Sequence, residues 1–320
     1  MATGELVDRL TRHDPATGAL DGSWLPTANG SRSVNDVAAA DNNIYIGGDF
    51  SHVSGVQHIG YAQFTNSPPA PNLVSLTMFD NDANGYIDTV EALFDKTLAP
   101  CAGPCTSNVT LFNPPSGATL SSVTTSGSVA TFNLTEGTGN ARTSVGGFRI
   151  ELPSSTGILA TDGSRASFDE QAPADGAPPV ALALSKTNAG TSGLPEAGDT
   201  YRINFSESLD TGSLPSTTTL SIVNGGGANN DQLTIAGVAQ GSIDLGSNTF
   251  INSGQANFAA ALTFESGSKN IRITLGSCSG SCGELTRGDR GTLTYVAASA
   301  IEDPAGNNAI GSITKTFRPF

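Results

Sequence analysis

Short segments in which apolar residues alternate with polar ones recur along most of this chain. In residues 88–94 the apolar positions are Val90, Ala92 and Phe94, and the same spacing returns in residues 199–205. A period of two is that of a half-buried β-strand, whereas an amphipathic helix repeats every three to four residues. Turn-forming residues separate the segments, so the pattern predicts an all-β fold. The other expected strands are residues 73–79, 108–112, 129–134, 147–152, 180–184, 219–223, 232–235, 261–264, 271–275, 292–296 and 313–317.

Two proline-rich stretches, residues 67–71 and 171–179, interrupt the strand pattern. We expect both to be linkers, because consecutive prolines favour extended backbone and cannot join a central strand. Residues 88–94 align without gaps on residues 199–205, which indicates an internal repeat. Two tandem β-sandwiches of about seven strands each are the natural packing for these segments. The expected domains are residues 1–67, 68–174 and 175–320.

The loop before the strand at residues 88–94 carries the most specific motif in the chain. Residues 80–91 read D-N-D-A-N-G-Y-I-D-T-V-E, which matches the calcium-loop pattern D-x-[DN]-x-[DN]-G with an acidic residue at the twelfth position. Oxygen atoms at alternate positions converge on one ion, and Gly85 permits the sharp turn that this requires. The candidate calcium ligands are the side chains of Asp80, Asp82, Asn84, Asp88 and Glu91 and the backbone carbonyl of Tyr86.

The internal repeat predicts that this loop joins two strands and does not enter the helix of an EF-hand. As a strand residue, Glu91 would point away from the core, which leaves its role as a ligand open. The corresponding loop of the second repeat, residues 186–199, lacks the alternating acids, so we expect one calcium ion and not two. The alternative interpretation is a solvated turn, because Asp, Asn and Gly are ordinary turn residues.

The charge of the chain restricts its partners. It has 29 acidic residues against 15 Lys and Arg, a formal net charge of -14. Such a surface repels phosphate backbones and anionic lipid headgroups, so we expect neither nucleic acid nor membranes as partners. The chain contains no apolar run of about 18 residues, so the sequence predicts no membrane-spanning helix. The first residues lack a basic and then apolar leader, and we interpret the chain as a piece of an exported protein.

Four cysteines form two close pairs, C-A-G-P-C at residues 101–105 and C-S-G-S-C at residues 278–282. In an oxidising compartment each pair can close a local disulfide. The rival interpretation is a four-cysteine zinc site, but such sites use C-x2-C pairs that lie close together in sequence. Local disulfides favour an extracellular or cell-surface location.

Residues 1–67 have a pattern of their own: R-L-T-R-H-D-P-A-T-G-A-L-D at residues 9–21, I-Y-I-G-G-D-F at 44–50 and G-Y-A-Q-F at 60–64. These motifs resemble the delta-60 type of bacterial β-propeller repeat over about one repeat. The resemblance implies a terminal propeller blade whose neighbours lie upstream, because a propeller needs several blades to bury their faces. A small irregular β-hairpin cap is the alternative.

The calcium-loop run D-x-D-x-N-G-x-I-D-x-V-x-x-x-F and the segment A-I-E-D-P-A-G-N at residues 300–307 support a second resemblance. They are similar to the immunoglobulin-like repeats of bacterial surface proteins and adhesins. The resemblance implies immunoglobulin-like sandwiches over residues 70–320, although T-D-G at residues 161–163 replaces the second motif in the first copy. We interpret the segment from Asp303 to Asn307 as a turn without chemistry.

None of the common catalytic motifs is present, and all three histidines lie in residues 1–67, so we do not expect an enzyme. Glu207 and Glu265 are interpreted as solvent-facing strand residues. Residues 224–231 are expected to form a flexible, exposed loop. Trp24 and Tyr61 could stack on a sugar, but lone aromatics near strand ends are more often core contacts.

The sequence therefore predicts a calcium-stabilised extracellular module with a structural or adhesive role in a bacterial surface protein. Its partners would be other surface or matrix components, or copies of itself. Two alternatives stay open: a carbohydrate-binding accessory region of a secreted hydrolase, and a filament subunit that pairs through exposed strand edges.

Overall fold

The computed structural model describes residues 10–11, 13, 17–20, 22, 26–29, 34–40, 43–65, 68–101, 105–106, 108–227 and 229–320. The fold of these residues is all-β, as predicted; their helical elements are three 3-10 turns, η1 (Pro115–Gly117), η2 (Ser154–Thr156) and η3 (Cys282–Glu284). None of these turns has the length or apolar character to cross a membrane. Contacts divide the chain into two compact units, Met1–Pro69 and Ala70–Phe320, with the boundary inside the first proline-rich stretch.

The first unit contains one small antiparallel sheet and one hairpin. The sheet has the order β1 (Val34–Ala40), β2 (Asn43–Gly48), β5 (Tyr61–Thr65), and the hairpin joins β3 (His52–Val53) to β4 (Val56–Gln57). Its buried core consists of Ile46, Phe50, Val53 and Ala62. Tyr61 is exposed and stacks on Tyr45, with ring centroids 6.2 Å apart, whereas Trp24 lies outside the described residues.

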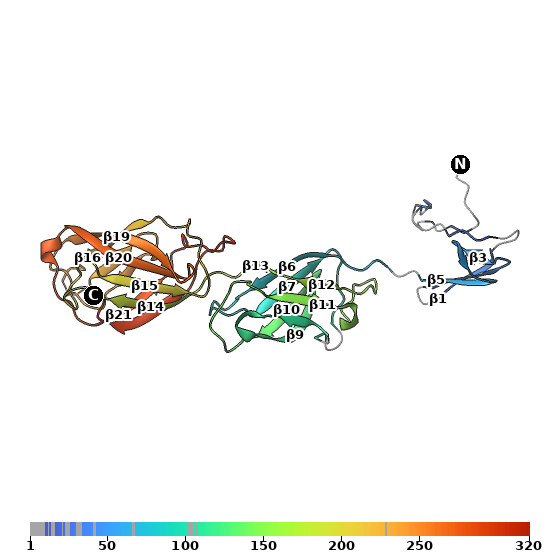
Figure 1. The fold of residues 1–320 in the computed structure, drawn as a ribbon, viewed down its shortest axis with the longest axis horizontal. Helices are drawn as coiled ribbons and strands as arrows, with labels where there is room; N and C mark the ends of the chain where they lie inside the picture. The colour runs from blue at the N-terminus through green and yellow to red at the C-terminus, as the bar shows by residue number, and fades with distance from the viewer. Residues whose placement is uncertain are drawn as a thin grey trace. The chain divides into compact units, whose positions relative to one another are not determined.

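The N-terminal part of the second unit packs two sheets around one core (Figure 1). The period of two is visible in β7, where Val90, Ala92 and Phe94 are buried and Glu91 is exposed. We call this part, residues 70–179, the first sandwich. Its five-stranded sheet has the order β13 (Ala174–Asp175), β6 (Leu73–Phe79), β7 (Thr89–Phe94), β10 (Val129–Thr135), β9 (Thr119–Ser126). Its second sheet has the order β12 (Phe168–Gln171), β11 (Arg149–Leu152), β8 (Thr110–Phe112).

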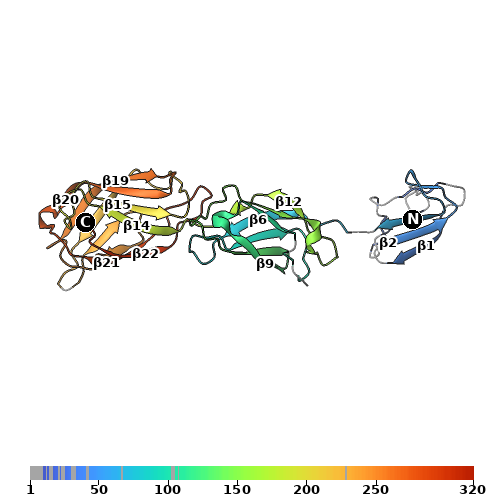
Figure 2. The same ribbon diagram turned by 60° about the horizontal axis from the view of Figure 1, so that its bottom comes forward.

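The C-terminal part, residues 180–320, which we call the second sandwich, differs from the first in the size of its sheets. Its main sheet has the order β14 (Ala181–Thr187), β15 (Thr200–Phe205), β20 (Asn270–Gly280), β19 (Gln255–Glu265), β16 (Thr217–Val223), β17 (Gln232–Ile235), β18 (Ser242–Asp244). The other sheet is the pair β21 (Gly291–Val296) and β22 (Ser312–Phe317). Both edges of the main sheet reach this pair: β14 contacts β22 (Figure 2), and β18 contacts β21. The seven-stranded sheet thus curves around its own core.

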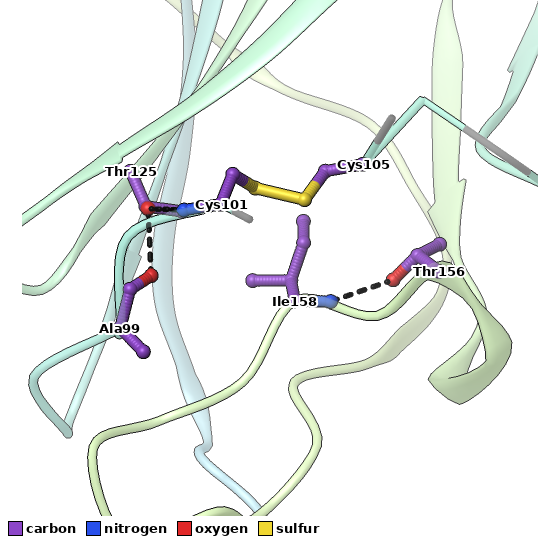
Figure 3. The surroundings of a disulfide bond; sticks show 6 residues. All are labelled: Ala99, Cys101, Cys105, Thr125, Thr156 and Ile158. Carbon is purple, nitrogen blue, oxygen red and sulfur yellow. Dashed lines mark hydrogen bonds between the residues drawn. A yellow bond between two sulfur atoms is a disulfide. The ribbon is translucent and has the colours of Figure 1, made fainter. Parts of the chain in front are cut away.

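All four cysteines form the two local disulfides that the sequence predicts, Cys101–Cys105 and Cys278–Cys282. Figure 3 shows the first of them above the buried side chain of Ile158. The Cys101 amide donates a hydrogen bond to Thr125 Oγ1 (3.1 Å), and this hydroxyl donates to the Ala99 carbonyl (2.8 Å). The disulfide therefore closes a loop that is also tied to strand β9.

Candidate metal-binding sites

The predicted calcium loop connects β6 to β7. Asp80 follows β6 directly and is only 6% exposed, and its carboxylate closes the loop by accepting hydrogen bonds from the amides of Asn84 (3.2 Å) and Gly85 (2.8 Å). Gly85 has φ +93, and a Cβ at this position would lie 3.0 Å from Leu182 Cδ2. Glycine is required here both for the backbone conformation and for the close approach of the second sandwich.

Three of the predicted ligands come together in this loop. Carboxylate oxygens of Asp80, Asp82 and Asp88 lie within 4.8 Å of one another, and they could hold a metal ion. Asn84 sits beside them: its side-chain nitrogen donates to Asp82 Oδ2 (2.9 Å), and its oxygen accepts from the Tyr86 amide (2.9 Å). We call Asp80, Asp82 and Asp88 the loop cluster.

The other two candidates lie differently. Glu91 does not belong to the loop cluster; it is exposed in the middle of β7, where its cross-strand neighbours are Thr77 and Thr131. The hydroxyl of Tyr86 donates to the Gly139 carbonyl (3.1 Å), which fixes the ring against a neighbouring loop. Of the predicted acidic ligands, the geometry therefore brings together Asp80, Asp82 and Asp88 and leaves Glu91 outside the loop cluster.

The loop cluster is electrostatically unfavourable without a cation. The pKa of Asp80 is raised to about 6, mainly by burial and also by the neighbouring Asp82, while the Gly85 and Asn84 amides act in the opposite direction. Closely spaced carboxylates repel one another when ionised, and a bound cation removes this repulsion.

A second group of carboxylates lies where the two sandwiches meet. Oxygens of Asp175, Glu207 and Asp303 are within 4.8 Å of one another and could also hold a metal ion. Asp175 ends β13 of the first sandwich, whereas Glu207 follows β15 and Asp303 begins a turn near the end of the second. We call these three residues the junction cluster.

Direct hydrogen bonds between the sandwiches surround the junction cluster. The hydroxyl of Thr143, from the first sandwich, donates to Glu207 Oε1 (2.5 Å) and lies 2.6 Å from Ser206 Oγ. Asp303 accepts hydrogen bonds from the amides of Ala305 and Asn307 (both 2.8 Å). The side-chain nitrogen of Asn307 also reaches the Asp175 carbonyl (3.3 Å), so the turn is fastened to the chain that links the sandwiches.

The junction cluster is the more deeply buried of the two groups. Glu207 and Asp303 are each 2% exposed. The pKa of Glu207 is raised to about 8, mainly by burial and also by the carboxyls of Asp175 and Asp303, while the hydrogen bond from Thr143 and the charge of Lys269 act in the opposite direction. Burial likewise raises the pKa of Asp175 to about 6, with a contribution from Asp303.

These observations correct two interpretations of the sequence. Glu207 does not face solvent: it lies two residues beyond the end of β15 and is buried in the junction. Asp303 to Asn307 is a turn, as predicted, but its first residue belongs to the junction cluster. The available signal for Glu207 was the alternation itself, because a period of two continued from the buried Ile203 and Phe205 places position 207 on the same face.

Two further expectations need smaller corrections. Glu265 is partly buried, with a side chain 24% exposed, because it bridges Arg272 on the neighbouring strand β20 and Arg202 on β15, the strand beyond it. The predicted exposed loop at residues 224–231 ends in a fully buried residue, Asp231, whose carboxylate accepts from the Phe250 amide (2.8 Å). In both cases a carboxylate has found a long-range partner that local sequence does not reveal.

Comparison of this chain with protein-family models, with curated proteins and with solved structures finds no match. Conclusions about function therefore rest on the chemistry of the two carboxylate clusters and on the fold that assembles them.

Proposed function

We propose that this chain is a calcium-stabilised structural or adhesive module of an extracellular bacterial surface protein, built from two immunoglobulin-like sandwiches. The observation that carries the proposal is the junction cluster, in which carboxylates of both sandwiches converge next to the loop that carries the calcium motif. An ion held there would connect the sandwiches directly. Its role would be to fix their orientation within a stalk that reaches other surface or matrix components.

The donor atoms support calcium over other metals. Both clusters offer carboxylate oxygens, and neither includes a histidine or a cysteine. Oxygen-only sites suit hard cations, and calcium accepts the irregular arrangement of six to eight oxygens that loop and junction carboxylates can provide. The two disulfides agree with an oxidising, calcium-rich compartment, where modules of this kind bind calcium at roughly 0.1–1 mM.

Calorimetric titration of the metal-free chain with calcium tests this proposal. We expect binding at two sites, one more than the sequence predicts, because the junction cluster is assembled from distant segments. Asp82→Ala should remove the loop site and Glu207→Gln the junction site. Asp169→Asn is a suitable control, because it removes an exposed carboxylate of β12 that belongs to neither cluster. Absence of bound calcium in elemental analysis, together with a melting temperature that EDTA leaves unchanged, would refute the proposal.

Small-angle scattering then tests the consequence for the junction. We expect calcium to narrow the distribution of distances between the two sandwiches in the wild-type chain and in Asp82→Ala, but not in Glu207→Gln. A forward scattered intensity per unit concentration that rises with protein concentration would favour the filament alternative, because it reports a growing particle mass.

A further inference from the structure

The outer face of the second sandwich carries two adjoining hollows that share no residue with either carboxylate cluster. The first is about 290 Å³ and is lined by residues of β14, β15 and β20: Ser185, Lys186, Thr187, Thr200, Arg202 and Arg272. The second is about 310 Å³ and lies between β14 and β22: Leu184, Ser185, Lys186, Lys315, Thr316 and Phe317. Because Ser185 and Lys186 line both, the hollows form one continuous surface, which we call the basic strip.

The basic strip concentrates positive charge on an acidic protein. Arg202 and Arg272 are direct cross-strand neighbours, and each side chain is 46% exposed. Like charges in such positions repel each other. The carboxylate of Glu265 contacts Arg202 and lies 3.3 Å from Arg272 Nη1, but its single negative charge balances only one of the two positive charges. Lys315 adds a further cation, and Lys186 adds a partly buried one whose Nζ donates to the Phe320 backbone oxygen (2.7 Å), so the strip has a net positive charge on a chain of net charge -14.

Unpartnered hydroxyl groups line the same surface. Thr200 lies on the same face of β15 as Arg202 and is only 8% exposed, yet its hydroxyl makes no hydrogen bond to any residue that the structure describes. The hydroxyls of Ser185 and Thr187 also lack partners among the described residues. The Thr200 hydroxyl is not among the buried polar atoms that lack a partner, so it opens on the hollow, where a ligand or solvent atom can accept its hydrogen bond.

We propose that the basic strip binds the carboxylate or sulfate groups of an acidic polysaccharide. Each guanidinium has five N–H donors in a planar arrangement that suits such oxyanions, and Glu265 leaves most of them unused. The hollows are at the small end of ligand pockets, a size suited to single sugar units, and the half-buried Phe317 offers a ring for apolar contact. Nucleic acid fits less well, because its dense phosphates would meet the acidic remainder of the surface.

Affinity measurements with the full chain test this inference at low ionic strength. The probes are polygalacturonate for carboxylates, dextran sulfate for sulfates and neutral dextran. We expect binding to at least one acidic polymer, which identifies the preferred group, and none to dextran. The double variant Arg202→Gln with Arg272→Gln should bind at least about tenfold more weakly, because it removes the charge-assisted hydrogen bonds. Thr200→Val should weaken binding severalfold without changing the charge.

A matched double variant separates this site from general charge effects. Arg149→Gln with Arg165→Gln removes the same charge from the first sandwich, where Arg149 lies 3.5 Å from Glu170. Its affinity should equal that of the wild type. Melting curves confirm that each variant is folded. Equal losses in both double variants, or no binding to either acidic polymer, would overturn the assignment.

The inference does not need the metal clusters, so the same measurements in EDTA should give the same affinities. Binding that requires calcium would refute the assignment to the basic strip, whereas a chain that binds no calcium but retains polymer binding would refute only the proposed function.

Discussion

Replacing Glu207 with Gln should stabilise the second unit at neutral pH when calcium is removed. In the metal-free protein, Glu207 is buried beside Asp175 and Asp303, and its ionisation places negative charge among other carboxylates. Gln has nearly the same shape and no charge, and it can still accept the hydrogen bond from Thr143. The substitution therefore removes the electrostatic cost and leaves the packing in place.

The sign and size of the effect follow from the pKa of Glu207. Burial and the neighbouring acids raise this pKa from the usual 4.5 to about 8, so the folded protein retains a proton that the unfolded chain releases. Stability is then highest at low pH and is lost as pH rises between these two values. At 1.36 kcal/mol per unit of pKa difference, wild type should lose about 2.5 kcal/mol from this group between pH 5 and pH 7.

Thermal unfolding in EDTA at pH 5, 6 and 7 measures this loss. We expect wild type to melt about 5–10 °C lower at pH 7 than at pH 5, since about 2–4 °C correspond to 1 kcal/mol in a unit of this size. The Glu207→Gln variant should show a smaller difference, and the part that remains comes from Asp80 and Asp175, whose pKa values are also raised to about 6. Saturating calcium should raise the wild-type melting temperature at pH 7, because the ion replaces the proton in neutralising the cluster.

A control variant makes this prediction specific. Glu170→Gln removes an exposed carboxylate of β12, so it should leave the dependence of the melting temperature on pH unchanged. If Glu207→Gln shows the same pH dependence as the wild type, or if Glu170→Gln flattens it equally, the raised pKa of Glu207 is not the cause.

Three other changes test different parts of the structure. Asp82→Ala should abolish the increase in melting temperature that calcium produces at the loop. This increase corresponds to about 2.7 kcal/mol at a calcium concentration a hundredfold above Kd. Glu91→Ala should keep most of the increase, and equal losses in the two variants would make Glu91 a ligand. Gly85→Ala should destabilise the fold by about 1–3 kcal/mol in chemical denaturation, because Ala is strained at φ +93; an unchanged midpoint would contradict this. In limited proteolysis, the first cuts, located by mass spectrometry, should fall near residues 67–71. Residues 171–179 should resist cleavage because they contact both sandwiches. Early cuts at this second stretch would argue against a packed junction.

Local patterns in the sequence were enough to predict the local features of this protein. The alternation of Val90, Ala92 and Phe94 predicted a half-buried strand, because strand geometry alone sends every second side chain to the same face. The cysteine spacing predicted two disulfides for a similar reason, since four residues of chain limit how far apart the sulfurs can lie. The motif at residues 80–91 likewise brings Asp80, Asp82 and Asp88 close together through one tight loop.

Features that join distant segments were decided only by the tertiary structure. Asp175, Glu207 and Asp303 are far apart in the chain, and they meet because the two sandwiches pack end to end through Thr143 and the turn at Asp303. Arg202 and Arg272 face each other because of the register between β15 and β20. Register and packing depend on the fit of whole sheets, and no short stretch of sequence carries that information.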